Sequence, residues 1–199
     1  MAKEILIKCV CGNEAAYAVD ATGVKCKYCR RPIIPADYVE AESVPEIDRN
    51  RQIALLNVLS KTNPGQAEVV MALGLFYLAN KAYQFAVQRF EEVINIDPTN
   101  ADAYYYQGIA MLGGKKAFSN LRTTIDSIEQ HLQSALAFNP KGIYYYFWAY
   151  LRYDHHSRKG YRVSPDYKQL LMQAKQYGVT ASEVNNLYKA LGVARPEVL

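Results

Sequence analysis

The sequence predicts a mainly helical fold, in which paired helices follow a small N-terminal β segment. Half of the 199 residues are hydrophobic and 21% are charged, the composition of a globular protein with ample material for a core. From residue 63 onward, apolar residues recur at helical spacing and are interrupted by glycine and proline. We expect four segments: the β segment at 1–37, a linker and capping helix at 38–62, helical repeats at 63–160 and C-terminal capping helices at 161–199.

All four cysteines lie in the first segment, in two close pairs that are fourteen residues apart: Cys9 with Cys11, and Cys26 with Cys29. Four thiolates in two such pairs can close a tetrahedron around Zn²⁺. The residues from the first pair to the second read as a strand, a turn and a returning strand, at Glu14–Asp20, Ala21–Gly23 and Val24–Cys26. The segment resembles a zinc ribbon, although its first pair encloses one residue where the commoner ribbon has two.

Disulfides or a redox-active dithiol are the alternatives for these cysteines. Disulfides suit an oxidising compartment, whereas the sequence shows neither a signal peptide nor a membrane span, so we expect the chain in the cytoplasm. A redox site needs one reactive pair rather than two presented together. We therefore expect about one structural zinc ion per monomer, whose four thiolates leave no position for a catalytic water.

Residues 38–62 are expected to join this segment to the helices and to cap them. The acidic stretch Asp37–Glu46 shows no helical stripe and reads as a linker. From Pro45 onward, apolar and polar residues mix as in a helix with one apolar side, which Asn63, Pro64 and Gly65 end. Such a helix would cover the exposed end of the first repeat, because repeat stacks need caps.

The stretch Ala67–Asn100 has the pattern of one complete helix-turn-helix unit. Its residues follow the spacing L-G-x2-Y, A-x3-F and P, at Leu73, Gly74, Tyr77, Ala86, Phe90 and Pro98. Gly74 and Ala86 are small where two helices would cross closely, and Tyr77 and Phe90 fill the space around that crossing. The stretch resembles a tetratricopeptide repeat in which Val70 replaces the usual tryptophan.

A second unit follows, with Gly108 at the crossing and Asn139-Pro140 at its end. It is eight residues longer than the first, and we place the surplus in Gly113–Arg122. A third, degenerate unit begins near Gly142 with a very aromatic helix, in which no glycine lies at the crossing and Ala149 could serve instead.

Paired histidines, His155 and His156, come next in a polar segment, where we expect them at the surface. An enzyme acting through Asp154 and these histidines is the least favoured hypothesis. The tail should form two helices: the first starts with Ser164 as its cap and Pro165 at its first position, and the second starts with a capping box at Thr180–Glu183.

A tetratricopeptide stack implies a concave groove lined by the first helix of each unit. The groove would be apolar and rich in tyrosine, which suits an amphipathic helix or an extended peptide, with Met71, Leu75, Tyr105, Ile109, Tyr144, Phe147 and Leu151 as its lining. A shifted register in the third unit would instead present Tyr146, Tyr150 and Tyr153. Alternatively, the chain's own last helices fill the space around these rings. The carboxylate clamp of chaperone-binding tetratricopeptide domains is absent, since the stripes carry apolar residues.

The leading hypothesis is a non-enzymatic adaptor that binds a partner protein or peptide, because no phosphate loop, nucleophile elbow or open metal cluster appears. The alternative is a nucleic-acid-binding accessory factor. Lysine and arginine outnumber aspartate and glutamate at both ends of the chain. The residues concerned are Lys8, Lys25, Lys27, Arg30 and Arg31, with Tyr28 as a stacking platform, and Arg158, Lys159 and Arg162 in the tail.

Overall fold

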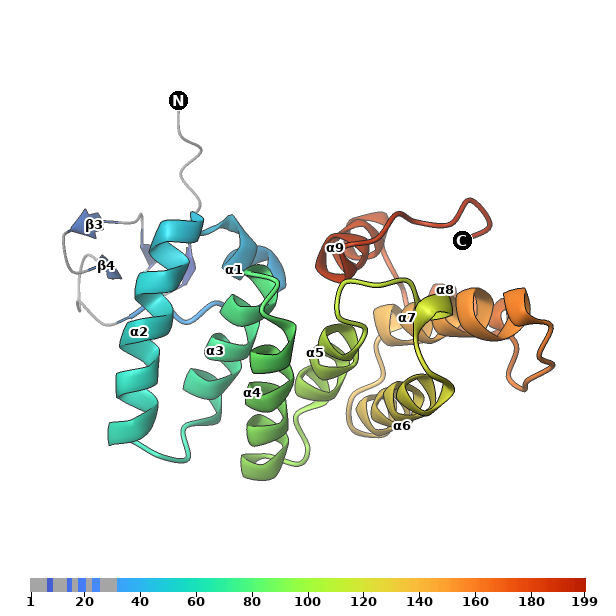
Figure 1. The fold of residues 1–199 in the computed structure, drawn as a ribbon, viewed down its shortest axis with the longest axis horizontal. Coiled ribbons are helices and arrows are strands. Elements are labelled where there is room, and N and C mark those ends of the chain that lie inside the picture. Colours follow the sequence, from blue (N-terminus) through green and yellow to red (C-terminus); the bar gives the residue numbers. More distant parts are fainter. Residues whose placement is uncertain (1–6, 9–13, 16–17, 21–22, 26–31) are drawn as a thin grey trace. The chain divides into compact units, whose positions relative to one another are not determined.

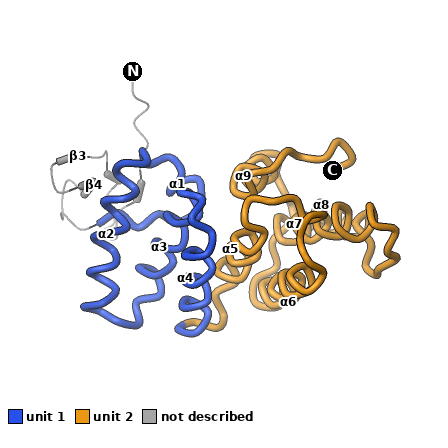
Figure 2. The backbone as a smooth tube through the Cα atoms, in the orientation of Figure 1, with its two compact units in different colours: residues 1–96 blue, residues 97–199 orange. Residues whose placement is uncertain are grey.

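We describe the fold from a computed structural model, which describes residues 7–8, 14–15, 18–20, 23–25 and 32–199. This part of the chain is mainly helical (Figure 1). It divides into two compact units, Met1–Ile96 and Asp97–Leu199 (Figure 2). The predicted repeat segment, residues 63–160, is therefore divided between the two units. Within the described ranges, the helices are all too short or too polar to cross a membrane.

Two short antiparallel ladders precede the helices. Their strands are β1 (Ile7–Lys8) with β2 (Glu14–Ala15), and β3 (Ala18–Asp20) with β4 (Gly23–Lys25). In the second ladder Val19 lies opposite Val24. The four cysteines lie outside the described residues, and the predicted zinc site lies there with them.

The first unit is built around α3 (Ala67–Ala79), which is apolar along nearly its whole length. A helix that is apolar all round must be covered on more than one side. Three helices contact it, namely α1 (Tyr38–Ser43), α2 (Glu46–Thr62) and α4 (Tyr83–Ile96). The helix predicted after Pro45 is therefore α2, and it ends at Asn63 as expected.

The helices α3 and α4 form a hairpin that crosses at Gly74. A Cβ atom placed on Gly74 would lie 2.5 Å from the ring of Phe90, which is fully buried. Ala86 is also fully buried. Gly74 and Phe90, two residues of the predicted pattern, thus meet where α3 and α4 cross. Because Gly74 has no side chain, the two helices can approach closely there.

One expectation for the first unit was wrong: the predicted linker contains a helix, α1. Asp37 caps it, because its carboxylate accepts the Glu40 N–H at 2.9 Å, and Tyr38 and Ala41 are buried. Just before it, the side-chain oxygen of Gln52 in α2 accepts the Ile33 N–H at 3.1 Å. A helix of six residues is too short to show a periodic apolar stripe in the sequence. Its N-cap and its contacts with α3 stabilise it instead.

The second unit contains two helical hairpins and a last helix. The first hairpin joins α5 (Ala101–Met111) to α6 (Arg122–Phe138), and the loop between them holds the 3₁₀ turn η1 (Ala117–Ser119). The second joins α7 (Gly142–Leu151) to α8 (Tyr167–Gln176), and α9 (Ala181–Leu191) follows. After α7 the chain forms a π-helical turn, η2 (Arg152–His156), and a 3₁₀ turn, η3 (Ser157–Lys159).

Gly108 behaves as predicted, since a Cβ there would lie 2.9 Å from Ile128 of α6. In the third unit the structure adds a close approach at Gly142, which the prediction did not include. A Cβ on Gly142 would lie 2.6 to 2.9 Å from backbone atoms of Ala174, Tyr177 and Val179. Helix α8 also starts later than expected: Asp166 is its cap and accepts the Gln169 N–H at 2.8 Å. The predicted capping box at Thr180 is confirmed.

The crossing in the first unit predicts that Gly74→Ala destabilises the protein. Alanine gains about 1 kcal/mol of helix propensity over glycine, but overpacking a core costs roughly 1–3 kcal/mol, and the Phe90 ring that the new methyl group would meet is fully buried. We expect a net loss in the free energy of unfolding, measured with urea. The control is the same substitution in a Phe90→Leu background. Gly74→Ala should lower the free energy of unfolding less in that background than in the wild type. An equal loss in both backgrounds would exclude the contact with Phe90 as the cause.

Candidate functional site

The predicted groove residues lie in both units, and the second unit holds five of them. Tyr105 and Ile109 are on α5, and Tyr144, Phe147 and Leu151 are on α7; all five are buried. The ring of Tyr105 lies 4.9 Å from that of Tyr144 and 5.9 Å from that of Phe147, between ring centres. The structure therefore brings Tyr105, Tyr144 and Phe147 together in one aromatic cluster. We call the surface that α5 and α7 turn towards α9 the tyrosine face.

Helix α9 occupies the tyrosine face. It contacts both α5 and α7, and its buried side chains are Val184, Leu187, Tyr188, Ala190 and Leu191. The ring of Tyr188 meets Tyr150 edge-on at 5.6 Å and Tyr146 at 6.3 Å. The rings that α9 contacts, Tyr146 and Tyr150, belong to the shifted register of the third unit, and a last helix covers them. The rings of the predicted groove residues Tyr105, Tyr144 and Phe147 contact one another instead.

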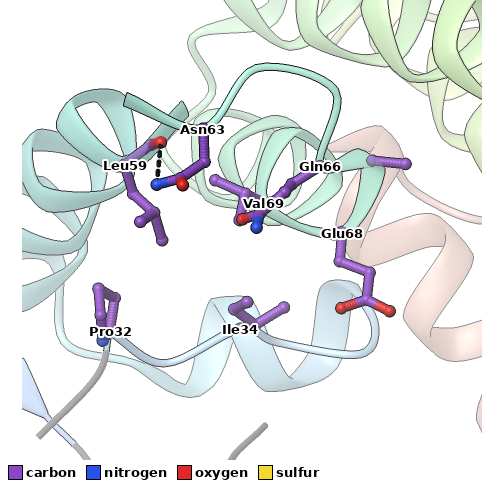
Figure 3. A pocket seen from close by; sticks show the side chains of 8 residues that line it. Pro32, Ile34, Leu59, Asn63, Gln66, Glu68 and Val69 are labelled. Atoms are coloured by element: carbon purple, nitrogen blue, oxygen red, sulfur yellow. Dashed lines mark hydrogen bonds between the residues drawn. The ribbon is translucent and has the colours of Figure 1, made fainter. Parts of the chain in front are cut away.

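The two groove residues of the first unit lie on α3. Leu75 is fully buried, whereas Met71 is partly exposed. Glu68, one turn earlier, borders a pocket of about 630 Å³ between the segment before α1, the end of α2 and the start of α3 (Figure 3). Apolar Leu59, Ile34 and Val69 line it as well. Among the lining residues that the structure describes, Glu68 is the one titratable group.

A polar end borders the aromatic cluster of the second unit. The hydroxyl of Tyr144 donates to Asp102 at 2.6 Å, and Lys141 pairs with the same carboxylate at 2.8 Å. Burial, followed by the charge of Asp102, raises the pKa of Tyr144 well above its ordinary value. The Tyr144 hydroxyl therefore remains a hydrogen-bond donor throughout the physiological pH range.

A second site, which the sequence analysis did not predict, lies between α6 and η2. Glu129 of α6 is buried and binds two partners: Arg152 at 2.8 Å through Oε2, and Nε2 of His156 at 3.1 Å through Oε1. Asp126, one turn earlier, is exposed and pairs with Arg122 at 3.6 Å. We call Asp126, Glu129 and His156 the carboxylate–histidine cluster.

His155 and His156 were expected at the surface, and this expectation was wrong. They are only 1% and 2% exposed. The π-helical turn places four of its five residues in the interior, so both histidines and Asp154 are buried together. The ring centre of His155 lies 5.0 Å from that of His156.

The long loop between α5 and α6 is fastened to this turn. The carboxylate of Asp154 accepts the Phe118 N–H at 2.8 Å and also pairs with Arg158. The hydroxyl of Tyr150 accepts the Ala117 N–H at 3.2 Å. The lengthened loop of the second unit thus packs on the π-helical turn η2. Its Phe118 N–H is the structural partner of Asp154 there.

Burial decides the protonation of this site. It raises the pKa of Glu129 to about 7 despite the opposing effect of Arg152. It lowers the pKa of His156 to about 4, and the positive charge of Arg152 adds to that effect. Burial also lowers the pKa of His155. At neutral pH both histidines are therefore uncharged, and an uncharged imidazole can bind a metal ion through a ring nitrogen.

The outer side of the same region carries exposed rings beside cations. Phe118, Leu121 and Tyr161 are 40%, 74% and 47% exposed. The guanidinium of Arg122 lies 5.6 Å from the ring centre of Tyr161, and Arg158 and Lys159 lie 4.7 and 5.0 Å from that of Phe118. We call this set of six residues the cation–aromatic surface. It includes two of the basic tail residues that the sequence analysis named.

The pKa shifts predict opposite pH dependences for two variants of the Glu129–His156 pair. In Glu129→Gln, the unfolded chain protonates His156 below about pH 6.5 whereas the folded chain does so only near 4, so stability falls as the pH drops through that window. In His156→Gln, folded Glu129 keeps its proton up to about pH 7 whereas the unfolded carboxyl loses it near 4.5, so stability falls as the pH rises.

Urea unfolding at several pH values from 4.5 to 7.5 measures both slopes, without added metal. The free energy of unfolding of each variant should change by on the order of 2 kcal/mol across its pH window, since one pKa unit corresponds to about 1.4 kcal/mol. The wild-type chain is the control, and its two opposing contributions should leave a flatter profile. Slopes of the same sign in both variants would show that burial does not set these pKa values.

Comparison with known proteins adds no family to this description. No protein-family model matches the chain, and a search of curated proteins found no match. The helical hairpins are therefore described by their own contacts, and their assignment to the tetratricopeptide type remains a prediction from the sequence pattern.

Proposed function

We propose that this protein is a non-enzymatic adaptor that binds a helix of a partner protein on the tyrosine face. The observation that supports this proposal is that the face already holds an amphipathic helix, α9. Insertion of an amphipathic helix between helices of a scaffold is a common mode of peptide recognition. Tyrosine-rich surfaces suit it, because each ring supplies a large contact area with few rotatable bonds.

The side chains of α9 describe the partner that would fit. Val184, Leu187, Tyr188 and Leu191 follow the i, i+3, i+4, i+7 spacing of one helix face. Glu183 lies in the first turn, where a negative charge is favourable, and its carboxylate accepts the Thr180 N–H at 2.8 Å. A partner helix would carry apolar anchors at the same spacing, one of them aromatic, and an acidic first turn.

Binding on this face requires exchange with α9. A four-residue connection joins α9 to α8. Helix α9 would therefore leave the face while it stays attached to α8, and the contact of the Tyr146 hydroxyl with the Leu199 carbonyl, at 3.0 Å, would have to break as well. While it stays attached, its effective concentration at the face is on the order of millimolar, so a competing helix must bind tightly or α9 must be weakened.

The N-terminal cysteine segment completes the proposal as a structural zinc ribbon, held by Cys9, Cys11, Cys26 and Cys29. These residues lie outside the described part of the chain, and the support for zinc is the chemistry of four thiolates in two pairs. We propose a cytoplasmic location, because a zinc site of four thiolates suits a reducing compartment.

The adaptor proposal predicts that the tyrosine face binds α9 in trans once the attached copy is weakened. In the full chain, Leu187→Ala/Tyr188→Ala removes two buried anchors, so a fluorescent peptide of residues 180–199 should bind with micromolar affinity, read by anisotropy. Wild type should bind it at least tenfold more weakly, because its own α9 competes.

Asn185→Ala is the matched control on the exposed side of α9, and it should behave as wild type. A peptide carrying Tyr188→Ala should lose at least tenfold in affinity. Circular dichroism establishes that the double variant keeps its helices. A folded double variant that does not bind the peptide would contradict the proposal.

The second candidate function is nucleic-acid binding, which the cation–aromatic surface favours. Exposed rings beside lysine and arginine are the arrangement on which single-stranded nucleic acid stacks and neutralises its phosphates. Three cations gather there around Phe118 and Tyr161. The basic residues of the first segment have no described side chains, so this candidate depends on the second unit.

Salt dependence distinguishes this candidate from the adaptor. If Arg122 and Lys159 each neutralise one phosphate, Arg122→Gln/Lys159→Gln should lower the slope of log affinity against log salt by about 1.4 for single-stranded RNA. The matched control is Lys61→Gln/Lys175→Gln, which removes two exposed lysines elsewhere and should leave the slope unchanged. Equal slopes for both double variants would remove nucleic acid as a ligand of this surface.

A further inference from the structure

We propose that the carboxylate–histidine cluster of Asp126, Glu129 and His156 binds a divalent transition-metal ion. One ligand atom of each residue lies within 4.8 Å of the other two. Asp126 and Glu129 are one turn apart on α6, and His156 comes from η2, so the ion would connect two elements that are distant in sequence. This site shares no residue with the predicted cysteine site.

The spacing of the two buried ligands suits an ion between them. Oε1 of Glu129 and Nε2 of His156 are 3.1 Å apart. Two ligands on metal bonds of about 2.1 Å lie roughly 3.0 Å apart at an octahedral angle and 3.4 Å apart at a tetrahedral one. A metal ion could therefore replace the hydrogen bond between these atoms with side-chain adjustments of a few tenths of an ångström.

The ligand types select a class of metal. One imidazole with two carboxylates suits Zn²⁺, Mn²⁺, Fe²⁺ or Co²⁺, whereas Ca²⁺ and Mg²⁺ prefer oxygen alone and Cu⁺ prefers sulfur. Asp126 is exposed, so the ion would keep at least one position open to water on that side. The class is thus a first-row divalent ion with mixed nitrogen and oxygen ligands.

The two arginines near the cluster do not block the site. Arg152 holds Oε2 of Glu129 and leaves Oε1 facing His156, which is how an outer partner orients a metal-binding carboxylate. The side chain of Arg122 is 65% exposed and its pairing with Asp126 is long, at 3.6 Å. Exposed pairs of this kind contribute little, so an ion can replace Arg122 at Asp126 at small cost.

A second, independent observation also points to a ligand. Among the described residues, Nδ1 of His156 is buried and has no hydrogen-bond partner. His155, which is 1% exposed, lies beside it with a ring-centre distance of 5.0 Å. Buried polar atoms are nearly always paired, so an unpaired imidazole nitrogen in this π-helical turn indicates a function beyond packing. Single π turns inside helices are frequent at functional sites.

Cobalt is the probe that separates this site from the cysteines. The full chain receives one equivalent of Zn²⁺, which the four thiolates of the predicted cysteine site bind first, and it is then titrated with Co²⁺. Cobalt on thiolates gives an intense sulfur-to-metal charge-transfer band, whereas cobalt on nitrogen and oxygen ligands gives only weak visible bands. We expect one additional Co²⁺ per chain with weak bands only, and paramagnetically shifted proton signals from a histidine ring.

The decisive variant is Asp126→Asn, because an exposed carboxylate can be changed without unfolding the core. It should weaken cobalt binding at least tenfold and leave the melting temperature of the cobalt-free protein unchanged. The matched control is Glu92→Gln, an exposed helical carboxylate that pairs with an arginine three residues away, and it should bind cobalt as wild type does. Glu129→Gln should abolish binding in protein that circular dichroism shows to be folded.

Three results would overturn the proposal. The first is that no cobalt binds beyond the cysteines. The second is an additional ion that shows the thiolate band. The third is a site that Asp126→Asn and Glu92→Gln weaken equally, which would mean that cobalt collects on surface carboxylates in general.

Discussion

The architecture depends on one constraint: the first helix of each hairpin is apolar on nearly all sides and must be covered on two of them. In the first unit α4 covers one side of α3, and α1 and α2 cover others. In the second unit α6 and α8 pair with α5 and α7, and α9 covers their remaining face. A helical hairpin alone leaves apolar surface in water, so each unit recruits extra helices. The proposed recognition surface is therefore closed by the chain itself, and binding becomes an exchange of helices.

The second unit combines this apolar packing with a polar interior. Glu129 joins α6 to the π-helical turn through Arg152 and His156, and Asp154 fastens the long loop to the same turn. A buried carboxylate is costly unless it is paired, so the network specifies which elements meet. It also presents two uncharged imidazoles beside an exposed carboxylate. The residues of the proposed metal site thus also hold α6 and the π-helical turn together.

Local signals in the sequence predicted the hairpins, the glycine crossings at Gly74 and Gly108, and the capping box at Thr180. Each of these depends on neighbouring residues or on a fixed spacing. Helix α1 was missed because six residues carry no period, and the burial of His155 and His156 depends on a π turn and on contacts with distant residues. One signal for their site existed: Glu129 lies on the apolar stripe of α6 with Ile125, Ile128 and Leu132, where a charged residue needs a partner.

Native-state hydrogen exchange of the full chain tests the central claim, that α9 is a replaceable occupant of the tyrosine face. Local opening of one element occurs at a lower free energy than global unfolding when that element has few contacts holding it. The account predicts that amides of α9 exchange through an opening that leaves the amides of α5, α6 and α7 protected. Exchange of α9 only together with those helices, at the free energy of global unfolding, would contradict it.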